Sequence, residues 1–137
     1  MEKITISNSQ LSVLRAEIQG LTNELSEQTA FLPKYHISNL VSALTPFLEN
    51  LEKSRVELVK KYGTEDEKGN VGIKEVTDET KDSEKPEFTE QYKTFVKDFG
   101  EILKVEIEIS YNKIPISVFE NVQTKGFYDV FYKFLTP

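Results

Sequence analysis

The chain of 137 residues contains no cysteine and no tryptophan, and His36 is its only histidine. The absence of cysteine excludes disulfides, thiolate nucleophiles, iron–sulfur clusters and cysteine-based zinc sites. Small secreted domains usually depend on disulfides, so this composition favours a reducing compartment. No long apolar run follows Met1, as a signal peptide or a membrane-spanning helix would require. We therefore expect a cytoplasmic protein that makes no contact with a membrane.

The sequence also lacks the motifs of the common enzyme classes. It has no glycine-rich phosphate loop, no nucleophile elbow and no His-Glu-x-x-His pattern. His36 invites a general-base interpretation, but no serine or acid stands at a recognisable motif spacing from it, so a histidine at the surface or at a helix start is favoured. We expect no enzymatic activity, no cofactor and no metal ion, and an enzyme is the third alternative after two binding roles.

The negative charge is concentrated in one part of the chain. The net charge is −6, and positive and negative side chains balance outside residues 64–90. Direct nucleic-acid binding requires clusters of lysine and arginine that displace counterions from phosphates, and the sequence has no such cluster. We therefore expect protein partners and no direct contact with nucleic acid.

The N-terminal part predicts a strand followed by a helix. Ile4 and Ile6 alternate with polar residues, which is typical of a short strand over residues 3–7. Ser7-Asn8-Ser9-Gln10 fits a capping box, in which a hydroxyl and an amide satisfy free N–H groups at a helix start. After it, apolar residues recur at spacings that place them on one helix face: Leu11, Leu14, Ile18, Leu21 and Leu25.

A second helix is predicted from about residue 34 to Gly63, antiparallel to the first. Leu32-Pro33-Lys34 is assigned to the connection, because the residue before a proline avoids helical geometry. Pro46 lies inside the helical stretch, so we expect a kink or break near Thr45. The leucine stripes of this hairpin leave homo-oligomerisation open.

The acidic stretch predicts turns and a loop before a third helix. Residues 65–70 form a polar turn with Gly69 and Asn70, and residues 77–86 are expected to be a mobile loop. A calcium loop is rejected, because aligning Gly69 with its required glycine places Lys68 at a ligand position. Pro86 suits the first turn of the third helix, whose stripe is aromatic and aliphatic: Phe88, Tyr92, Phe95, Phe99 and Ile102.

The C-terminal part predicts strands and a short aromatic helix. Residues 104–111 alternate strictly, and Glu106 and Glu108 share one face; we interpret them as the solvated face of a half-buried sheet rather than as a carboxylate pair for acid–base chemistry or cation binding. Asn112-Lys113 is expected to turn into a short second arm, followed by a capped helix near residues 118–122 and a helix over residues 127–135. The complete chain is predicted to be one α+β domain: an antiparallel helical hairpin and a third helix packed on a small, mainly antiparallel sheet, with a short aromatic C-terminal helix.

Two surfaces stand out as candidates for interaction with a partner. One is the acidic stretch and the other is the tyrosine-rich terminus, since tyrosines are favoured at protein interfaces. The candidate residues are Glu65, Asp66, Glu67, Asp78, Glu79, Asp82, Tyr128 and Tyr132. A core helix with a solvent-facing tyrosine edge is the alternative for the terminus.

Four stretches of the chain together resemble small uncharacterised proteins of tailed bacteriophages and prophages. These are ITISNSQL, FLPKYHISNLVSAL, RVELVKKYGTEDEKGN and KVEIEISYNKIPISVFENV. The resemblance implies a phage origin and carries no established activity. Together with the missing catalytic motifs, it leads us to expect a non-enzymatic phage protein that binds a host or phage protein in the host cytoplasm, as an inhibitor of host defence or a host-takeover factor. The alternative is a virion or morphogenesis accessory, such as an assembly chaperone or a head–tail component; a small signalling ligand is also left open.

Overall fold

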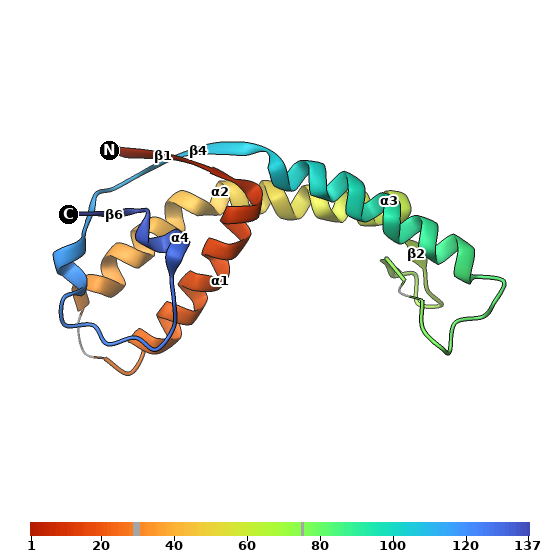
Figure 1. Ribbon diagram of the computed structural model, residues 1–137, viewed down its shortest axis with the longest axis horizontal. Helices are drawn as coiled ribbons and strands as arrows, with labels where there is room; N and C mark the ends of the chain where they lie inside the picture. The colour runs from red at the N-terminus through yellow and green to blue at the C-terminus, as the bar shows by residue number, and fades with distance from the viewer. Residues whose placement is uncertain (29–30, 75) are drawn as a thin grey trace. The chain divides into compact units, whose positions relative to one another are not determined.

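The computed structural model describes residues 1–28, 31–74 and 76–137 (Figure 1). The elements are β1 (Glu2–Ser7), α1 (Asn8–Leu25), α2 (Phe31–Tyr62), β2 (Thr64–Glu65), β3 (Val71–Gly72), α3 (Lys85–Lys104), β4 (Glu106–Tyr111), β5 (Ile114–Pro115), the 3-10 helix η1 (Ile116–Phe119), α4 (Asp129–Tyr132) and β6 (Leu135–Thr136). Helices combined with small, mainly antiparallel sheets confirm the predicted α+β class.

The chain, predicted from its sequence as one domain, divides into two compact units. The first consists of Met1–Leu48 and Glu106–Pro137, and the second of Glu49–Val105. The first part of α2 therefore belongs to the first unit and its last part to the second.

The capping box at the start of α1 forms as the sequence predicts. The Ser7 hydroxyl accepts the N–H of Gln10 at 3.1 Å, and the Gln10 side-chain oxygen accepts the N–H of Ser7 at 3.1 Å. Each residue thus satisfies a backbone donor that the helix itself leaves free. The box fixes the point at which β1 turns into α1.

The core of the first unit is built on the apolar stripe of α1, which is buried as predicted. Its members are Leu11, Leu14, Ile18, Leu21 and Leu25. The core also includes buried side chains from other segments, among them Ile6 and Ile109 from the sheet, Ile37, Leu40 and Leu44 from α2, and Phe131 and Phe134 near the C-terminus. At about 1.5–3 kcal/mol for each fully buried aliphatic or Phe side chain, this cluster is the main stabilising term of the unit.

One sheet of the first unit pairs β1, near the N-terminus, with β4, which follows α3 in the chain. β1 and β4 are antiparallel, with Ile4 opposite Ile109 and Ile6 opposite Ile107. One face of this two-stranded sheet is exposed and carries Glu106 and Glu108, as the alternation predicted. On this face the ammonium nitrogen of Lys3 lies 3.9 Å from a carboxylate oxygen of Glu108.

Helix α2 differs from its prediction at two prolines. It begins at Phe31, so Pro33 lies in its first turn, where the missing N–H leaves no intrahelical bond unmade. It also continues through Pro46, so of the kink or break predicted near Thr45, the break does not occur. The Thr45 hydroxyl donates to the Val41 carbonyl oxygen at 2.8 Å, one turn back.

The second unit contains the end of α2, the β2–β3 hairpin and α3. The Tyr62 hydroxyl donates to the Asp98 carboxylate at 2.7 Å, and the Thr64 hydroxyl donates to the Gln91 side-chain oxygen at 2.8 Å. These hydrogen bonds hold the start of the hairpin close to α3. Pro86 lies in the first turn of α3, as predicted. Among the described residues, every buried apolar side chain belongs to the first unit, so the stripe of α3 is only half-buried or exposed.

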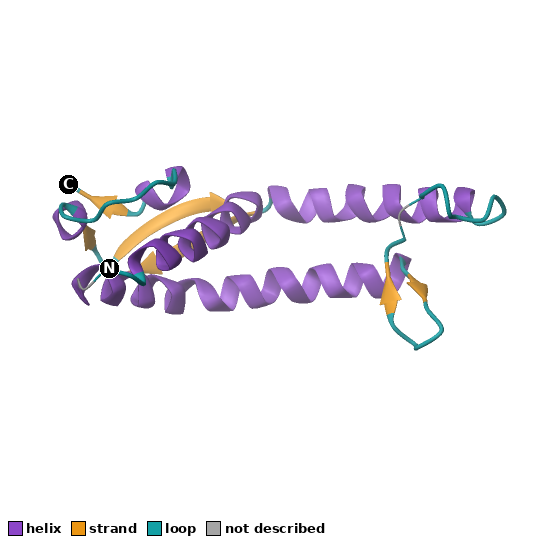
Figure 2. Ribbon diagram, turned by 90° about the horizontal axis from the view of Figure 1, so that it is seen from below, coloured by secondary structure: helices purple, strands orange, loops and turns teal. Residues whose placement is uncertain are grey.

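The C-terminal region is the part that the sequence describes least well. The predicted helix over 127–135 is wrong beyond one turn, because only Asp129–Tyr132 is helical (Figure 2). β5 pairs in parallel with β6, and not with β4 as the second arm of a hairpin. Near the predicted capped helix at 118–122 the chain instead forms η1, and no side chain caps it.

Gly63, directly after α2, provides a test of packing in the second unit. A Cβ atom there would lie 2.3 Å from the Val59 carbonyl oxygen and 2.7 Å from Val71 Cγ1, so Gly63→Ala is expected to destabilise the fold by about 1–3 kcal/mol. Gly100→Ala is the control: apart from its chain neighbours and the backbone of its own helix, no atom lies within 4 Å of the added Cβ, and the change should stabilise α3 by about 0.5–1 kcal/mol. Urea unfolding followed by circular dichroism measures both, and equal effects would contradict the expected crowding at Gly63.

Candidate functional site

The C-terminal segment, residues 116–136, is attached to α1 by hydrogen bonds from the helix's polar side chains. The Glu17 carboxylate accepts the N–H of Val130 with its two oxygens at 3.0 and 3.2 Å, close to the start of α4. A carboxylate at this place satisfies a free donor of the short helix. Glu17 therefore does for α4 what a capping residue within the segment would otherwise do.

A second carboxylate holds the loop that precedes α4. Glu24 accepts the N–H of Lys125 at 2.5 Å with one oxygen and the hydroxyl of Tyr128 with the other. Beyond the end of α1, the Gln28 side-chain amide donates to the Gln123 carbonyl oxygen at 3.1 Å. Glu24 follows Glu17 by about two helical turns, so the two glutamates lie on one side of α1.

Gly126 allows the Tyr128 ring to fold back on the loop. A Cβ at position 126 would lie 2.7 Å from the Tyr128 hydroxyl oxygen and 2.9 Å from Cζ. The ring is consequently 7% exposed, and its hydroxyl is directed to Glu24 rather than to solvent.

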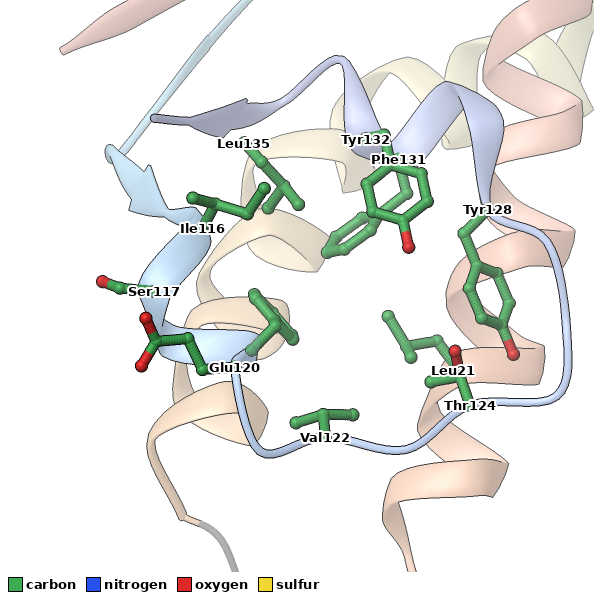
Figure 3. A pocket seen from close by; sticks show the side chains of 11 residues that line it. Leu21, Ile116, Ser117, Glu120, Val122, Thr124, Tyr128, Phe131, Tyr132 and Leu135 are labelled. Carbon is green, nitrogen blue, oxygen red and sulfur yellow. The ribbon is translucent and has the colours of Figure 1, made fainter.

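The attached segment encloses an apolar hollow of about 400 Å³ (Figure 3). Its lining comes from α1, η1, the following loop, α4 and β6: Leu21, Ile116, Ser117, Phe119, Glu120, Val122, Thr124, Tyr128, Phe131, Tyr132 and Leu135. Phe119 meets Phe131 edge to face, with ring centroids 5.6 Å apart. In Figure 3, Leu21 and Tyr132 point into the hollow from different sides.

The hollow has a buried interior and an exposed apolar rim. Leu21 and Phe131 are 2% and 3% exposed, whereas Ile116 and Tyr132 are 49% and 56% exposed. Among the residues that line it, Glu120 is the charged one. The arrangement suits the capture of an apolar group far better than acid–base chemistry.

No group of three metal-ligating side chains occurs in the described part of the chain. His36 lies on α2, and its buried Nδ1 has no hydrogen-bond partner among the residues that the structure describes. Glu106 and Glu108 lie on the exposed face of the sheet.

The predicted acidic residues all belong to the second unit and are exposed: Glu65, Asp66, Glu67, Asp78, Glu79 and Asp82. Asp66 differs from the others because its carboxylate accepts the N–H groups of Asn70 and Lys68, each at 2.9 Å. Gly69, with a φ of 82°, closes this turn in left-handed geometry. The acidic stretch thus begins with a hydrogen-bonded turn, and the mobility of residues 77–86 stays a prediction.

The two predicted tyrosines, Tyr128 and Tyr132, belong to the first unit, whereas the acidic residues belong to the second. Tyr132 lies at the rim of the hollow and offers an exposed ring, while Tyr128 forms part of its wall. The structure thus brings these two tyrosines together at one feature of the first unit.

The sequence reasoning missed an exposed apolar cluster in the first turns of α2. Phe31, Leu32 and Tyr35 are 75%, 51% and 49% exposed. The rings of Phe31 and Tyr35 stack, with their centroids 6.3 Å apart. Assigning residues 32–34 to a connection hid this cluster. The signal that could have revealed it is the i, i+4 spacing of the two aromatic residues, which places them on one helix face.

Comparison of the chain with protein-family models, with curated proteins and with solved structures finds no match. Among the described residues, no helix is long and apolar enough to span a membrane.

Removal of the Glu24 carboxylate tests the attachment of the C-terminal segment. Glu24→Ala should lower the free energy of unfolding by about 1.5–3 kcal/mol, because it leaves the Lys125 N–H and the Tyr128 hydroxyl without their acceptor. Glu27→Ala, at an exposed carboxylate near the end of α1, should change it by less than about 0.5 kcal/mol. In a double-mutant cycle, Glu24→Ala and Tyr128→Phe should couple by about 1 kcal/mol, and strict additivity would contradict the bond.

The Asp66 turn leads to a prediction about pH. Hydrogen bonds from the backbone of Asn70, then from that of Lys68, stabilise the carboxylate and hold the pKa of Asp66 below its ordinary value of 3.8. Because the pKa is lowered, the turn contributes its full stabilisation at pH values above the ordinary pKa of the carboxyl group. This stabilisation is lost as the pH falls through the pKa that Asp66 has in the folded protein. An NMR titration of the Asp66 carboxyl carbon should show this lowered pKa; a value at or above 3.8 would be inconsistent with the turn.

Proposed function

We propose that this chain is a non-enzymatic, phage-encoded protein that acts in the host cytoplasm by binding a host or phage protein, as an inhibitor of host defence or a host-takeover factor. The observation that carries the proposal is the apolar hollow with an exposed rim at Ile116 and Tyr132. The likeness of the sequence to small phage proteins supports the phage origin. The absence of enzyme motifs from the sequence supports a binding role.

The hollow has the properties of a pocket for an anchor side chain. Binding energy at protein interfaces is concentrated where an aromatic or aliphatic side chain enters a well-packed pocket surrounded by groups that exclude water. Leu21 and Phe131 supply the apolar interior, and Ile116 and Tyr132 supply exposed apolar surface at the entrance. Hydrogen bonds from α1 hold the walls before a partner arrives, which lowers the entropy lost on binding.

The charges define the kind of partner further. Glu120 lines the hollow, so a partner with a lysine or arginine beside its apolar anchor fits it. The net charge of −6, located in residues 64–90, would attract a basic protein surface over a longer range. A protein whose normal ligand is nucleic acid has such a surface.

The experiment compares Ile116→Asp with Val13→Asp. Ile116 and Val13 are each 49% exposed, but Val13 lies on α1 and does not line the hollow. The tagged chain is used to capture partners from a bacterial host lysate, and the captured protein is then purified and titrated against each variant. Wild type and Val13→Asp should bind with equal affinity, and Ile116→Asp should bind at least tenfold more weakly, since about 1.4 kcal/mol or more of apolar contact is lost.

Two results would overturn the proposal. One is a directly binding partner that Ile116→Asp binds as tightly as wild type does, with both variants folded by circular dichroism. The other is the failure of every captured protein to bind the purified chain at physiological salt.

A virion or morphogenesis accessory is the second candidate function. The exposed cluster of Phe31, Leu32 and Tyr35 favours it, because a component of an assembly contacts more than one neighbour and needs more than one apolar surface. Mass spectrometry of purified virions distinguishes the two: peptides of this chain in the particle favour the accessory role, and their absence favours the inhibitor.

A further inference from the structure

A groove between α1 and α2 of the first unit forms a second apolar site, separate from the hollow. Its volume is about 540 Å³, within the range of small-molecule sites. Leu25 and Ile37 form its floor and are 1% and 5% exposed, while Val41 is 39% exposed at the wall. The groove therefore offers an apolar surface on which an apolar body can lie.

The rim of the groove carries the Lys34 ammonium group, which has no acidic partner among the described residues. The Lys34 ammonium donates to the Gln28 carbonyl oxygen at 2.7 Å and is partly buried there. An ammonium group has three donors, and the bond to Gln28 uses one of them. No carboxylate of the described residues lies within 4.0 Å of it.

Hydroxyl groups complete the polar side of the groove. Thr22, Ser26 and Ser38 line it together with Lys34. The Ser26 hydroxyl donates its proton to the Asn23 carbonyl oxygen at 2.7 Å, so it is not a donor for a ligand. A cation beside an apolar floor, with the hydroxyl groups of Thr22 and Ser38, matches a molecule with one anionic end and one apolar end.

We propose that this groove binds a small amphiphilic carboxylate, with its apolar body on Leu25, Ile37 and Val41 and its carboxylate accepting hydrogen bonds from Lys34. The charge of Lys34 selects an anion over a neutral molecule of the same shape. The proposal does not depend on the partner protein, because none of the three apolar residues lines the hollow.

Octanoate and the neutral octanol are the probes that test it. In methyl-resolved NMR of the full chain, octanoate should shift the methyl signals of Leu25, Ile37 and Val41 in a saturable manner. Lys34→Met, which keeps the apolar stem and removes the charge, should weaken octanoate binding about tenfold and leave octanol binding unchanged. Lys113→Met, at an exposed lysine outside the groove, should bind both probes as wild type does.

A blocking variant shows whether the groove itself is the site. Ser38 is exposed on α2, so Ser38→Trp can fill the groove without disturbing the core, and it should abolish binding of both probes. Octanoate shifts at Leu21 and Leu135 instead of at the groove would overturn the proposal, as would equal octanoate affinity in Lys34→Met and wild type. Absence of any saturable shift would overturn it as well.

Discussion

The bonds from the carboxylates of Glu17 and Glu24 to the C-terminal segment are the interactions on which the proposed binding site depends. The segment contains one short 3-10 helix, one turn of α-helix and a two-residue strand. Its own hydrogen bonds are therefore too few to determine its backbone conformation. The two glutamates accept the N–H groups of Val130 and Lys125, which have no acceptor in a regular element. Hydrogen bonds to a charged acceptor are the stronger class, and here each one places part of the wall of the hollow.

The apolar stripe of α1 makes this attachment possible. Leu21 belongs to the stripe and also lines the hollow, so one helix supplies both the core of the first unit and the floor of the candidate site. The polar positions between the leucines carry the glutamates. A helix whose core contacts are rigid can present these carboxylates at fixed positions, and that rigidity is what a preformed pocket needs.

The sequence predicted the elements that follow from local patterns and missed those that depend on distant partners. The capping box at Ser7, the stripe of α1 and the alternation of β4 were all read correctly, because periodicity and capping are local. The helix predicted over 127–135 was wrong beyond one turn. Glu24 and Glu17 of α1 accept the N–H groups of Lys125 and Val130, and these contacts hold most of the region in a non-helical conformation. The pairing of β5 with β6 was missed for the same reason, and the hollow that arises from both could not be foreseen.

Hydrogen exchange of the Lys125 and Val130 backbone amides in the native protein tests the central claim most directly. If the glutamates of α1 hold the C-terminal segment and so preform the hollow, both amides should be protected and should exchange together with the amides of the central turns of α1. Exchange of both at the rate of an unstructured peptide, while α1 stays protected, would contradict the account.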